Sequence, residues 1–143
     1  MSLERVTAIG PDFDPLIKAA TGGGHRFMET LRREWADGSN RFDRDGEVYF
    51  AVRCDGRLIA TGGLNRDPYA LRTDIGRVRH VYVLEPARRG GVGRLLIGAI
   101  IDHARSGFSL LRLRTATAQG AAFYEALGFS RCDDEGASHT LPL

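Results

Sequence analysis

One arginine- and glycine-rich stretch organises the rest of this sequence: Arg88-Arg89-Gly90-Gly91-Val92-Gly93-Arg94-Leu95-Leu96. It follows a run typical of a β-strand, residues 77–84, and it opens a run typical of a helix, residues 92–105. The first N–H groups of a helix have no internal partner, and the helix dipole makes that end positive. Glycines let the backbone approach a ligand closely, and arginines pair with phosphate oxygens. The stretch therefore predicts a site for a phosphate or pyrophosphate.

The spacing of the glycines excludes two common phosphate loops. A dinucleotide-binding turn needs a third glycine where this chain has Leu96, and a P-loop needs lysine and serine or threonine where it has Arg94 and Leu95. The spacing that is present, Arg-x-x-Gly-x-Gly over residues 88–93, resembles the pyrophosphate loop of the GNAT superfamily. These N-acetyltransferases use acetyl-coenzyme A.

A second motif lies downstream, at Phe123-Tyr124-Glu125-Ala126-Leu127-Gly128-Phe129. It follows an alternating, strand-like run at 110–115, it is rich in helix formers, and its glycine stands where a helix C-cap belongs. It is similar to the family's C-terminal signature, a tyrosine on a short helix that ends in Gly-Phe. The resemblance is clearest over residues 78–129.

The resemblance implies roles for particular residues. Backbone groups near Val81, Tyr82 and Val83 would line the pantetheine arm of acetyl-CoA and polarise its carbonyl. The pyrophosphate would be bound at the turn, by Arg88, Arg89, Gly90, Gly91, Val92, Gly93 and Arg94. Tyr124 would act as general acid toward the coenzyme A sulfur; the alternative is a tyrosine at a helix edge whose hydroxyl is bonded locally. Thr117 stands where relatives often carry an asparagine that holds the cofactor, and threonine offers fewer hydrogen-bonding groups.

The sequence assigns no general base. Glu85 ends the strand beside the turn, His80 lies within that strand, and Glu29 and Glu34 belong to a segment that shapes the acceptor pocket in relatives. For each of these side chains the alternative to a role as base is a structural role or a place in solvent. A chain of water molecules would also serve to accept the proton.

The acceptor amine also stays open. Residues 21–40 and the loop 65–76 are expected to form its pocket, and Phe27, Trp35 and Tyr69 are candidates to line it. A small-molecule amine and a protein N-terminus both remain as acceptors.

Composition favours one compact domain over residues 1–143, because 43% of the residues are hydrophobic and 27% are charged. No apolar run approaches the ~20 residues of a membrane helix, and the first residues lack a signal-peptide pattern. A net charge of +2 does not suggest a nucleic-acid partner. Cys54 and Cys132 lack metal-ligand spacing, and Cys54 is expected to be a buried thiol. We therefore expect a cytoplasmic protein without a metal, with a homodimer as one open assembly.

The expected elements alternate between strands and helices. In chain order they are a strand at 5–9, helices at 15–20 and 25–35, strands at 48–54, 57–64 and 77–84, a helix at 92–105, a strand at 110–115, a helix from 119 and a strand at 138–141. An apolar stripe of the helix at 92–105 is expected to dock on the sheet, made of Val92, Leu95, Leu96, Ala99, Ile100 and His103. The resemblance implies an α/β GNAT fold, a mixed central sheet with helices on both faces. In that fold the strand before the turn and the next strand splay apart around the pantetheine arm.

The implied activity is transfer of an acetyl group from acetyl-CoA to a primary amine by direct attack in a ternary complex. Two alternatives belong to other classes. A non-catalytic module that binds or senses acyl-CoA keeps the glycine turn without needing Tyr124. If the domain instead binds a nucleotide at the turn, we expect ATP rather than coenzyme A to compete for the site.

Overall fold

The computed structural model describes residues 1–134 and 136–143. A seven-stranded sheet crosses the molecule in the order β1-β2-β3-β4-β5-β7-β6. The strands are β1 (Ser2–Arg5), β2 (Val48–Cys54), β3 (Arg57–Arg66), β4 (Ile75–Val83), β5 (Leu110–Leu113), β6 (Ser130–Arg131) and β7 (His139–Pro142). The β4–β5 pair is parallel and the other neighbouring pairs are antiparallel, so the sheet is mixed.

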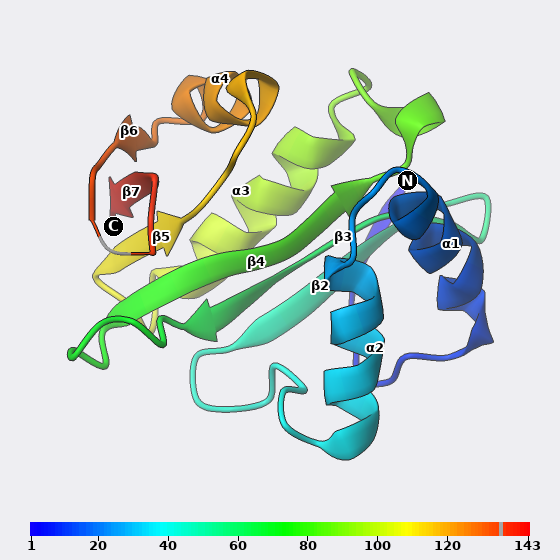
Figure 1. Cartoon of the computed structure of the whole chain (residues 1–143), viewed down its shortest axis with the longest axis horizontal. Helices are drawn as coiled ribbons and strands as arrows, with labels where there is room; N and C mark the ends of the chain where they lie inside the picture. Colours follow the sequence, from blue (N-terminus) through cyan, green and yellow to red (C-terminus); the bar gives the residue numbers. More distant parts are fainter. Residues whose placement is uncertain (135) are drawn as a thin grey trace.

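Helices cover both faces of the sheet (Figure 1). They are α1 (Asp14–Gly22), α2 (Phe27–Asp37), α3 (Val92–Ala104) and α4 (Ala118–Ala126), and short 3-10 turns span Pro11–Phe13 and Glu85–Ala87. One apolar core joins α3 and α4 to the sheet, and a second core joins α1 and α2 to the opposite face. The predicted α/β architecture is confirmed.

Local signals placed the β2–β3 hairpin correctly. The strand β2 has the predicted bounds, and Asp55 and Gly56 have φ angles of +53° and +79°, as a two-residue turn between right-twisted strands requires. The first strand was placed wrongly, because β1 covers Ser2–Arg5 instead of residues 5–9. All four β1 residues are exposed at a sheet edge, so no hydrophobic alternation marks this strand.

The buried stripe of α3 also differs from the prediction. Leu95 is 40% exposed, whereas the buried residues are Val92, Leu96, Ile97, Ile100 and Ala104. The helix docks over Gly62 of β3, where a Cβ would lie 3.1 Å from Leu96 and 3.5 Å from Ile100. Three consecutive apolar residues, 95–97, left the rotation of the helix undetermined in the sequence. Cys54, predicted as buried, is only half-buried.

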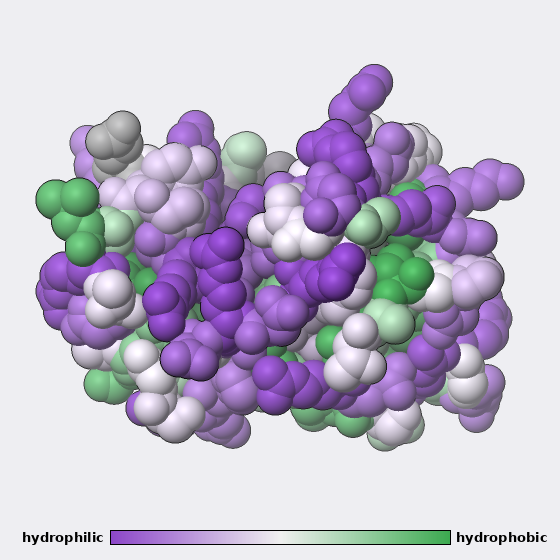
Figure 2. Space-filling model, turned by 90° about the horizontal axis from the view of Figure 1, so that it is seen from below, coloured by the Kyte–Doolittle hydropathy of each residue, from purple (hydrophilic) through white to green (hydrophobic). Residues whose placement is uncertain are grey.

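The surface seen from below is mainly hydrophilic, with small hydrophobic patches (Figure 2). The exposed large hydrophobic side chains of the described residues are Met1, Leu3, Tyr69, Leu71 and Leu95. None of the helices in this part of the chain has the length and apolar character needed to cross a membrane.

Candidate active site

Two parallel strands separate at the centre of the sheet. The β4–β5 ladder pairs Ile75 with Leu110, Gly76 with Leu111 and Arg77 with Arg112, and it ends there. From Val78 onward, the β4 backbone groups that point toward β5 therefore have no strand partner. Unpaired backbone N–H and C=O groups are binding groups for a ligand that lies along the strand.

A β-bulge lies in β4 beside this gap. Thr61 of β3 pairs with Tyr82 and Gly63 pairs with Arg79, so His80 and Val81 together face one residue of β3. His80 has a φ of +55°, a region that costs a non-glycine residue about 1 kcal/mol or more. Bulges of this kind re-aim the residues that follow and occur often near functional sites.

The His80 imidazole is buried next to the bulge. Only 9% of the residue is exposed, and its ring lies 5.9 Å from the Phe27 ring and 6.0 Å from the Phe42 ring. Burial lowers the pKa of His80 to about 4, and the Arg79 charge acts in the same direction. The ring is therefore neutral at pH 7 and too weak a base to take a proton efficiently from an ammonium group.

A groove of about 500 Å³ runs through the gap between β4 and β5. Most of the predicted site residues line it, namely Val81, Tyr82, Val83, Arg88, Arg89, Gly91, Gly93, Arg94, Thr117 and Tyr124. Of the remaining two, Gly90 lies outside the lining, and Val92, the first residue of α3, is buried in the core. The groove therefore brings the glycine turn, the strand before it and the C-terminal tyrosine together.

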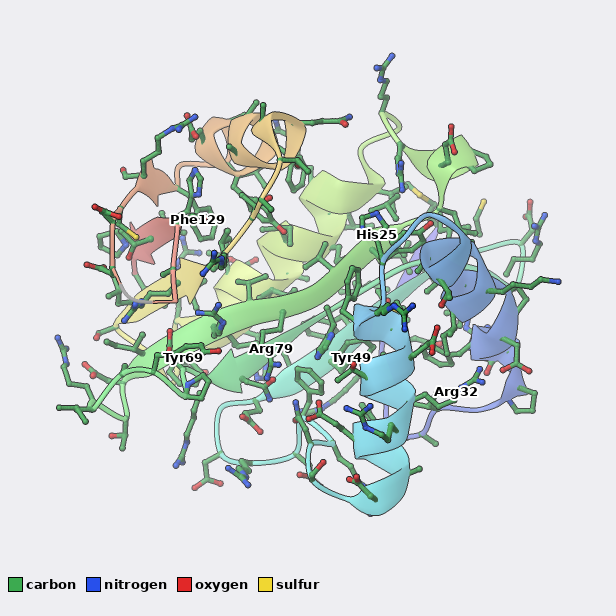
Figure 3. All side chains as sticks on the ribbon, in the orientation of Figure 1. His25, Arg32, Tyr49, Tyr69, Arg79 and Phe129 are labelled. Atoms are coloured by element: carbon green, nitrogen blue, oxygen red, sulfur yellow. The ribbon has the colours of Figure 1, made fainter. Side chains whose placement is uncertain are left out.

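The groove also contains residues that sequence reasoning missed. These are His25, Thr115, Gln119, Gly120 and Phe123. Four of them lie on or just before α4, which follows β5; because β5 runs parallel to β4, its C-terminal end opens on the same groove. His25 comes from the α1–α2 loop and lies above β4 (Figure 3), and only the preceding glycines mark its position in the sequence.

The glycine turn leaves the N-terminus of α3 free. Gly91 is the N-cap residue with a φ of +82°, and no side chain caps the helix. The first intrahelical bond runs from the Leu95 N–H to the Gly91 carbonyl, at 3.0 Å. The amides of residues 92–94 therefore lack helix partners and can bind an anion. Gly93 serves packing as well, since a Cβ there would lie 3.0 Å from the Phe123 ring.

Three arginines surround this turn. The Arg88 Nε donates to the Val83 carbonyl at 2.9 Å, and the guanidinium lies 5.6 Å from the centre of the Tyr82 ring. These contacts hold Arg88 beside the groove. Arg89 and Arg94 form no ion pair with the residues that the structure describes. This end of the groove is thus positively charged.

Tyr124 is fixed by the way its helix ends. The Gly128 N–H donates to the Glu125 carbonyl and the Phe129 N–H to the Tyr124 carbonyl, both at 3.1 Å, with Gly128 at a φ of +103°. This Schellman ending packs the Phe129 ring 5.6 Å from the Tyr124 ring, and the Phe123 ring lies 5.0 Å from the Tyr124 ring. Burial raises the pKa of Tyr124 well above its usual range, so the hydroxyl stays protonated. No described residue hydrogen-bonds this hydroxyl.

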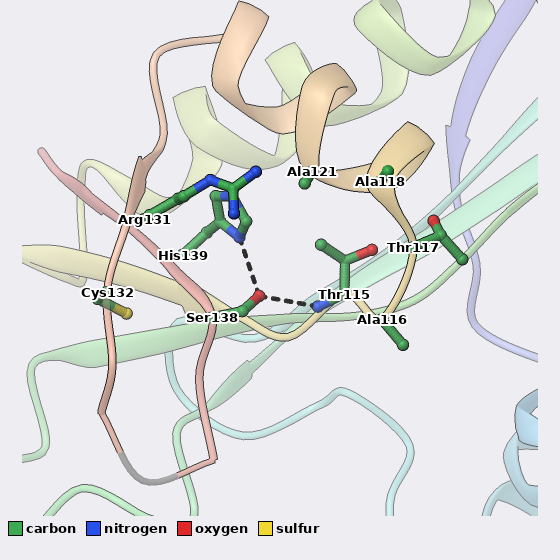
Figure 4. A pocket seen from close by; sticks show the side chains of 9 residues that line it. All are labelled: Thr115, Ala116, Thr117, Ala118, Ala121, Arg131, Cys132, Ser138 and His139. Carbon is green, nitrogen blue, oxygen red and sulfur yellow. Dashed lines mark hydrogen bonds between the residues drawn. The ribbon is translucent and has the colours of Figure 1, made fainter.

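The segment between β5 and α4 is held from two sides. The Thr117 side chain caps α4 by accepting the Gly120 N–H at 3.0 Å, which occupies part of its hydrogen-bonding capacity. Behind it, in a pocket of about 320 Å³, Ser138 Oγ accepts the Thr115 N–H at 3.0 Å (Figure 4). Ser138 also bonds His139 Nδ1 at 2.9 Å.

The chain of bonds continues from β7 to α4. His139 Nε2 lies 2.8 Å from Glu125 Oε2, and that carboxylate also pairs with Arg131 at 3.1 Å. The bond to His139 is the main cause that lowers the pKa of Glu125. Because Glu125 is the neighbour of Tyr124, this chain fixes the helix that carries the tyrosine.

Most of the other sequence candidates lie away from the groove. Glu29 and Glu85 are exposed, Glu34 is half-buried in α2, and Trp35 is buried against Phe42 and Tyr49. Of the three aromatic candidates for the acceptor pocket, Phe27 lines the groove, whereas Tyr69 is 59% exposed in the loop after β3. The described residues contain no cluster of three His, Cys, Asp or Glu side chains that fits a metal ion.

Two curated mycobacterial proteins are similar to this chain. An uncharacterized protein of Mycobacterium leprae is 31% identical over 115 residues, which cover 71% of this chain and 30% of that protein. N-alpha-acetyltransferase RimI of Mycobacterium tuberculosis is 31% identical over 88 residues, or 58% of this chain and 52% of that protein. The chain thus spans about a third to a half of the length of these relatives.

Solved structures share the fold over its full extent. A proposed acetyltransferase from Exiguobacterium sp. 255-15 has a TM-score of 0.87 and 31% identity, covering 99% of this chain and 92% of that one. A ribosomal-protein-alanine N-acetyltransferase from Brucella melitensis has a TM-score of 0.72 with 18% identity and covers both chains fully. Residues 16–129, which include the glycine turn and the Tyr124 helix, match the family described as the Acetyltransferase (GNAT) family. The chain therefore belongs to the GNAT family of acetyltransferases.

Proposed function

We propose that this protein transfers an acetyl group from acetyl-CoA to a primary amine by direct attack within a ternary complex. One observation carries the proposal. A single groove connects the uncapped N-terminus of α3, the unpaired edge of β4 and the Tyr124 side chain. The anion site, the strand edge and the proton donor are then within reach of one extended ligand.

The groove suits the parts of acetyl-CoA in order. The pyrophosphate would meet the free amides of α3 and the charges of Arg88, Arg89 and Arg94. The pantetheine amides would pair with the open edge of β4 near Val81 and Val83. The thioester would then lie close to the bulge, and unpaired backbone N–H groups there are suited to stabilise an oxyanion.

The chemistry requires one bond to form and one to break. A neutral amine attacks the thioester carbon, the carbon–sulfur bond breaks, and the amine proton leaves to a base or to water. Tyr124 would donate its proton to the departing sulfur, and burial keeps its hydroxyl protonated at neutral pH. The proton acceptor stays open; His25 is the histidine that lines the groove.

Calorimetric titration tests the donor site first. We expect acetyl-CoA to bind in the micromolar range and ATP not to bind, because ATP lacks the pantetheine arm that pairs with β4. Release of free thiol during an amine screen then measures turnover. Binding of ATP that competes with acetyl-CoA, or no binding of acetyl-CoA, would contradict the proposal.

A further inference from the structure

The face of the sheet that carries α2 also carries a row of arginines. Arg77 pairs across the ladder with Arg112, so both side chains share one face. Arg79 pairs with Gly63, where a Cβ would lie 2.6 Å from Tyr49 in the core beneath α2. Arg79 therefore projects on this face, and Figure 3 shows it between Tyr69 and Tyr49.

The deeper part of this row surrounds a buried carboxylate. Asp67 Oδ2 lies 3.6 Å from Arg77 Nη1 and 3.5 Å from Arg112 Nε, and the Asp67 side chain is fully buried. Arg77 also donates to the Gly136 carbonyl at 2.5 Å. Burial lowers the pKa of Arg77. The negative charge of Asp67 raises this pKa, whereas the positive charges of Arg79 and Arg112 lower it further.

Arg79 is the member of the row that lacks a counterion. It is half-buried, and its Nη1 donates to Oδ1 of the neutral Asn65 at 3.4 Å. The nearby Glu47 carboxylate is occupied by Asn65 Nδ2 at 2.9 Å and by the Arg66 N–H at 3.0 Å. Among residues 1–134 and 136–143, no carboxylate lies within 4.0 Å of Arg79. A guanidinium partly removed from water without a counterion is suited to bind an anion.

The place of Arg79 separates it from the pyrophosphate end of the groove. It directly precedes the His80–Val81 bulge, at the narrow end of the gap between β4 and β5. The glycine turn follows Val83, which is four residues or about 13 Å along the strand. An anion bound at Arg79 is therefore not the phosphate held at α3, and it lies next to the point where the acetyl group would be transferred.

We infer that Arg79 binds a carboxylate of the acceptor, and that the acceptor class is a small amine carrying a carboxylate. This inference rests on the proposed acetyl transfer. The amine would lie at the bulge and the carboxylate at Arg79, the residue that directly precedes the bulge in β4. A series of ω-amino acids of increasing length tests which separation of the amine and the carboxylate the protein accepts. The carboxylate is unchanged in the reaction; the carbon–sulfur bond of the donor breaks and a carbon–nitrogen bond forms.

Matched acceptors test the inference. Glycine, 3-aminopropanoate, 4-aminobutanoate and 5-aminopentanoate are each compared with the corresponding amide, with thiol release as the readout. We expect kcat/KM for a carboxylate member to exceed that of its amide by about 10-fold or more, because the amide loses a charge-assisted bond to Arg79. Equal rates for carboxylates and amides would overturn the inference.

Variants locate the effect. Arg79→Gln is expected to lower kcat/KM for the carboxylates about 10- to 100-fold, mainly through KM, and to leave kcat/KM for the amides unchanged. Arg79→Lys keeps the positive charge, so its kcat/KM for the carboxylates should lie between those of the wild type and Arg79→Gln. Arg57→Gln, at the exposed β2–β3 hairpin, is the control for loss of one positive charge. The dissociation constant for acetyl-CoA should be the same in all four proteins. Equal losses for carboxylates and amides in Arg79→Gln would also overturn the inference.

A binding measurement separates this inference from the proposed activity. Calorimetric titration of the four amino acids is repeated with protein saturated with coenzyme A, where no turnover occurs. Binding to the wild type that is lost in Arg79→Gln supports the carboxylate site even if no amine is acetylated, and the absence of turnover then contradicts the proposed transfer alone. Absence of amino-acid binding to the wild type, with acetyl-CoA bound normally, overturns the carboxylate site alone.

Discussion

Substitutions at the N-terminus of α3 separate the effect of side-chain charge on acetyl-CoA binding from the effect of side-chain bulk. Gly91 has a φ of +82°, and a Cβ there would meet no atom within 4 Å. Asparagine and aspartate have the same shape and tolerate the left-handed conformation better than other side chains. Gly91→Asn and Gly91→Asp therefore share the same backbone strain of about 1–2 kcal/mol and the same bulk. They differ by one negative charge at the proposed pyrophosphate site.

The magnitude of that difference follows from Coulomb's law. At about 5 Å, one charge repels another by about 1 kcal/mol in water and about 3 kcal/mol at the effective dielectric of a protein surface. We expect Gly91→Asp to bind acetyl-CoA about 5- to 150-fold more weakly than Gly91→Asn. Calorimetry at two salt concentrations measures both dissociation constants, and the ratio should shrink at the higher concentration.

Gly98→Asp is the matched control. Gly98 lies on the same helix, about 10 Å further along its axis, and a Cβ there also meets no atom within 4 Å. Screening at that distance should leave the acetyl-CoA dissociation constant within about 2-fold of the wild type. If Gly91→Asp and Gly91→Asn fold and bind acetyl-CoA equally well, no phosphate lies at this helix end and the assignment of the groove is refuted.

Three further predictions concern the tyrosine, the bulge and the core. Tyr124→Phe should leave the acetyl-CoA dissociation constant nearly unchanged and lower kcat about 10-fold or more, measured by thiol release; an unchanged kcat would remove Tyr124 from proton transfer. The pKa of His80 is about 4 in the folded protein and 6.5 in the unfolded chain, so the unfolded chain binds more protons between pH 4 and 6.5. The free energy of unfolding should therefore fall by up to about 3 kcal/mol as the pH drops from 6.5 to 4. Chemical denaturation across that range should show this loss in the wild type and in His25→Asn but not in His80→Asn, and a loss that persists in His80→Asn would contradict the assignment. Gly63→Ala should destabilise by about 1–3 kcal/mol because its Cβ would lie 2.5 Å from Phe42, whereas Gly98→Ala should stabilise slightly; equal urea midpoints for the two variants would contradict this packing.

The sequence allowed prediction of those parts of the site that rest on local backbone chemistry. The turn at Gly91 and the helix end at Gly128 both require positive φ angles, and glycine marks such positions directly. The hairpin at Asp55-Gly56 was placed for the same reason. Features set by tertiary packing had no such marker, and the exposed edge strand β1 and the rotation of α3 were therefore misplaced.

The bulge at His80 is the feature that no sequence pattern revealed and on which the site depends most. In an unbroken strand, every second residue lies on the same face of the sheet, so one face would carry Arg77, Arg79, Val81 and Val83. The extra residue reverses the alternation, so Val81 and Val83 pack with the α3 core while Tyr82 joins the core under α2.

This reversal separates two functions along one strand. Beyond the bulge, both faces of β4 border the groove that leads to the α3 turn, because Val81 and Val83 line it from one side and Tyr82 from the other. Before the bulge, Arg79 stays on the α2 face without a counterion among the described residues. A donor that lies along the far part of β4 and an acceptor anchored at Arg79 would therefore meet at the bulge from opposite ends of the strand.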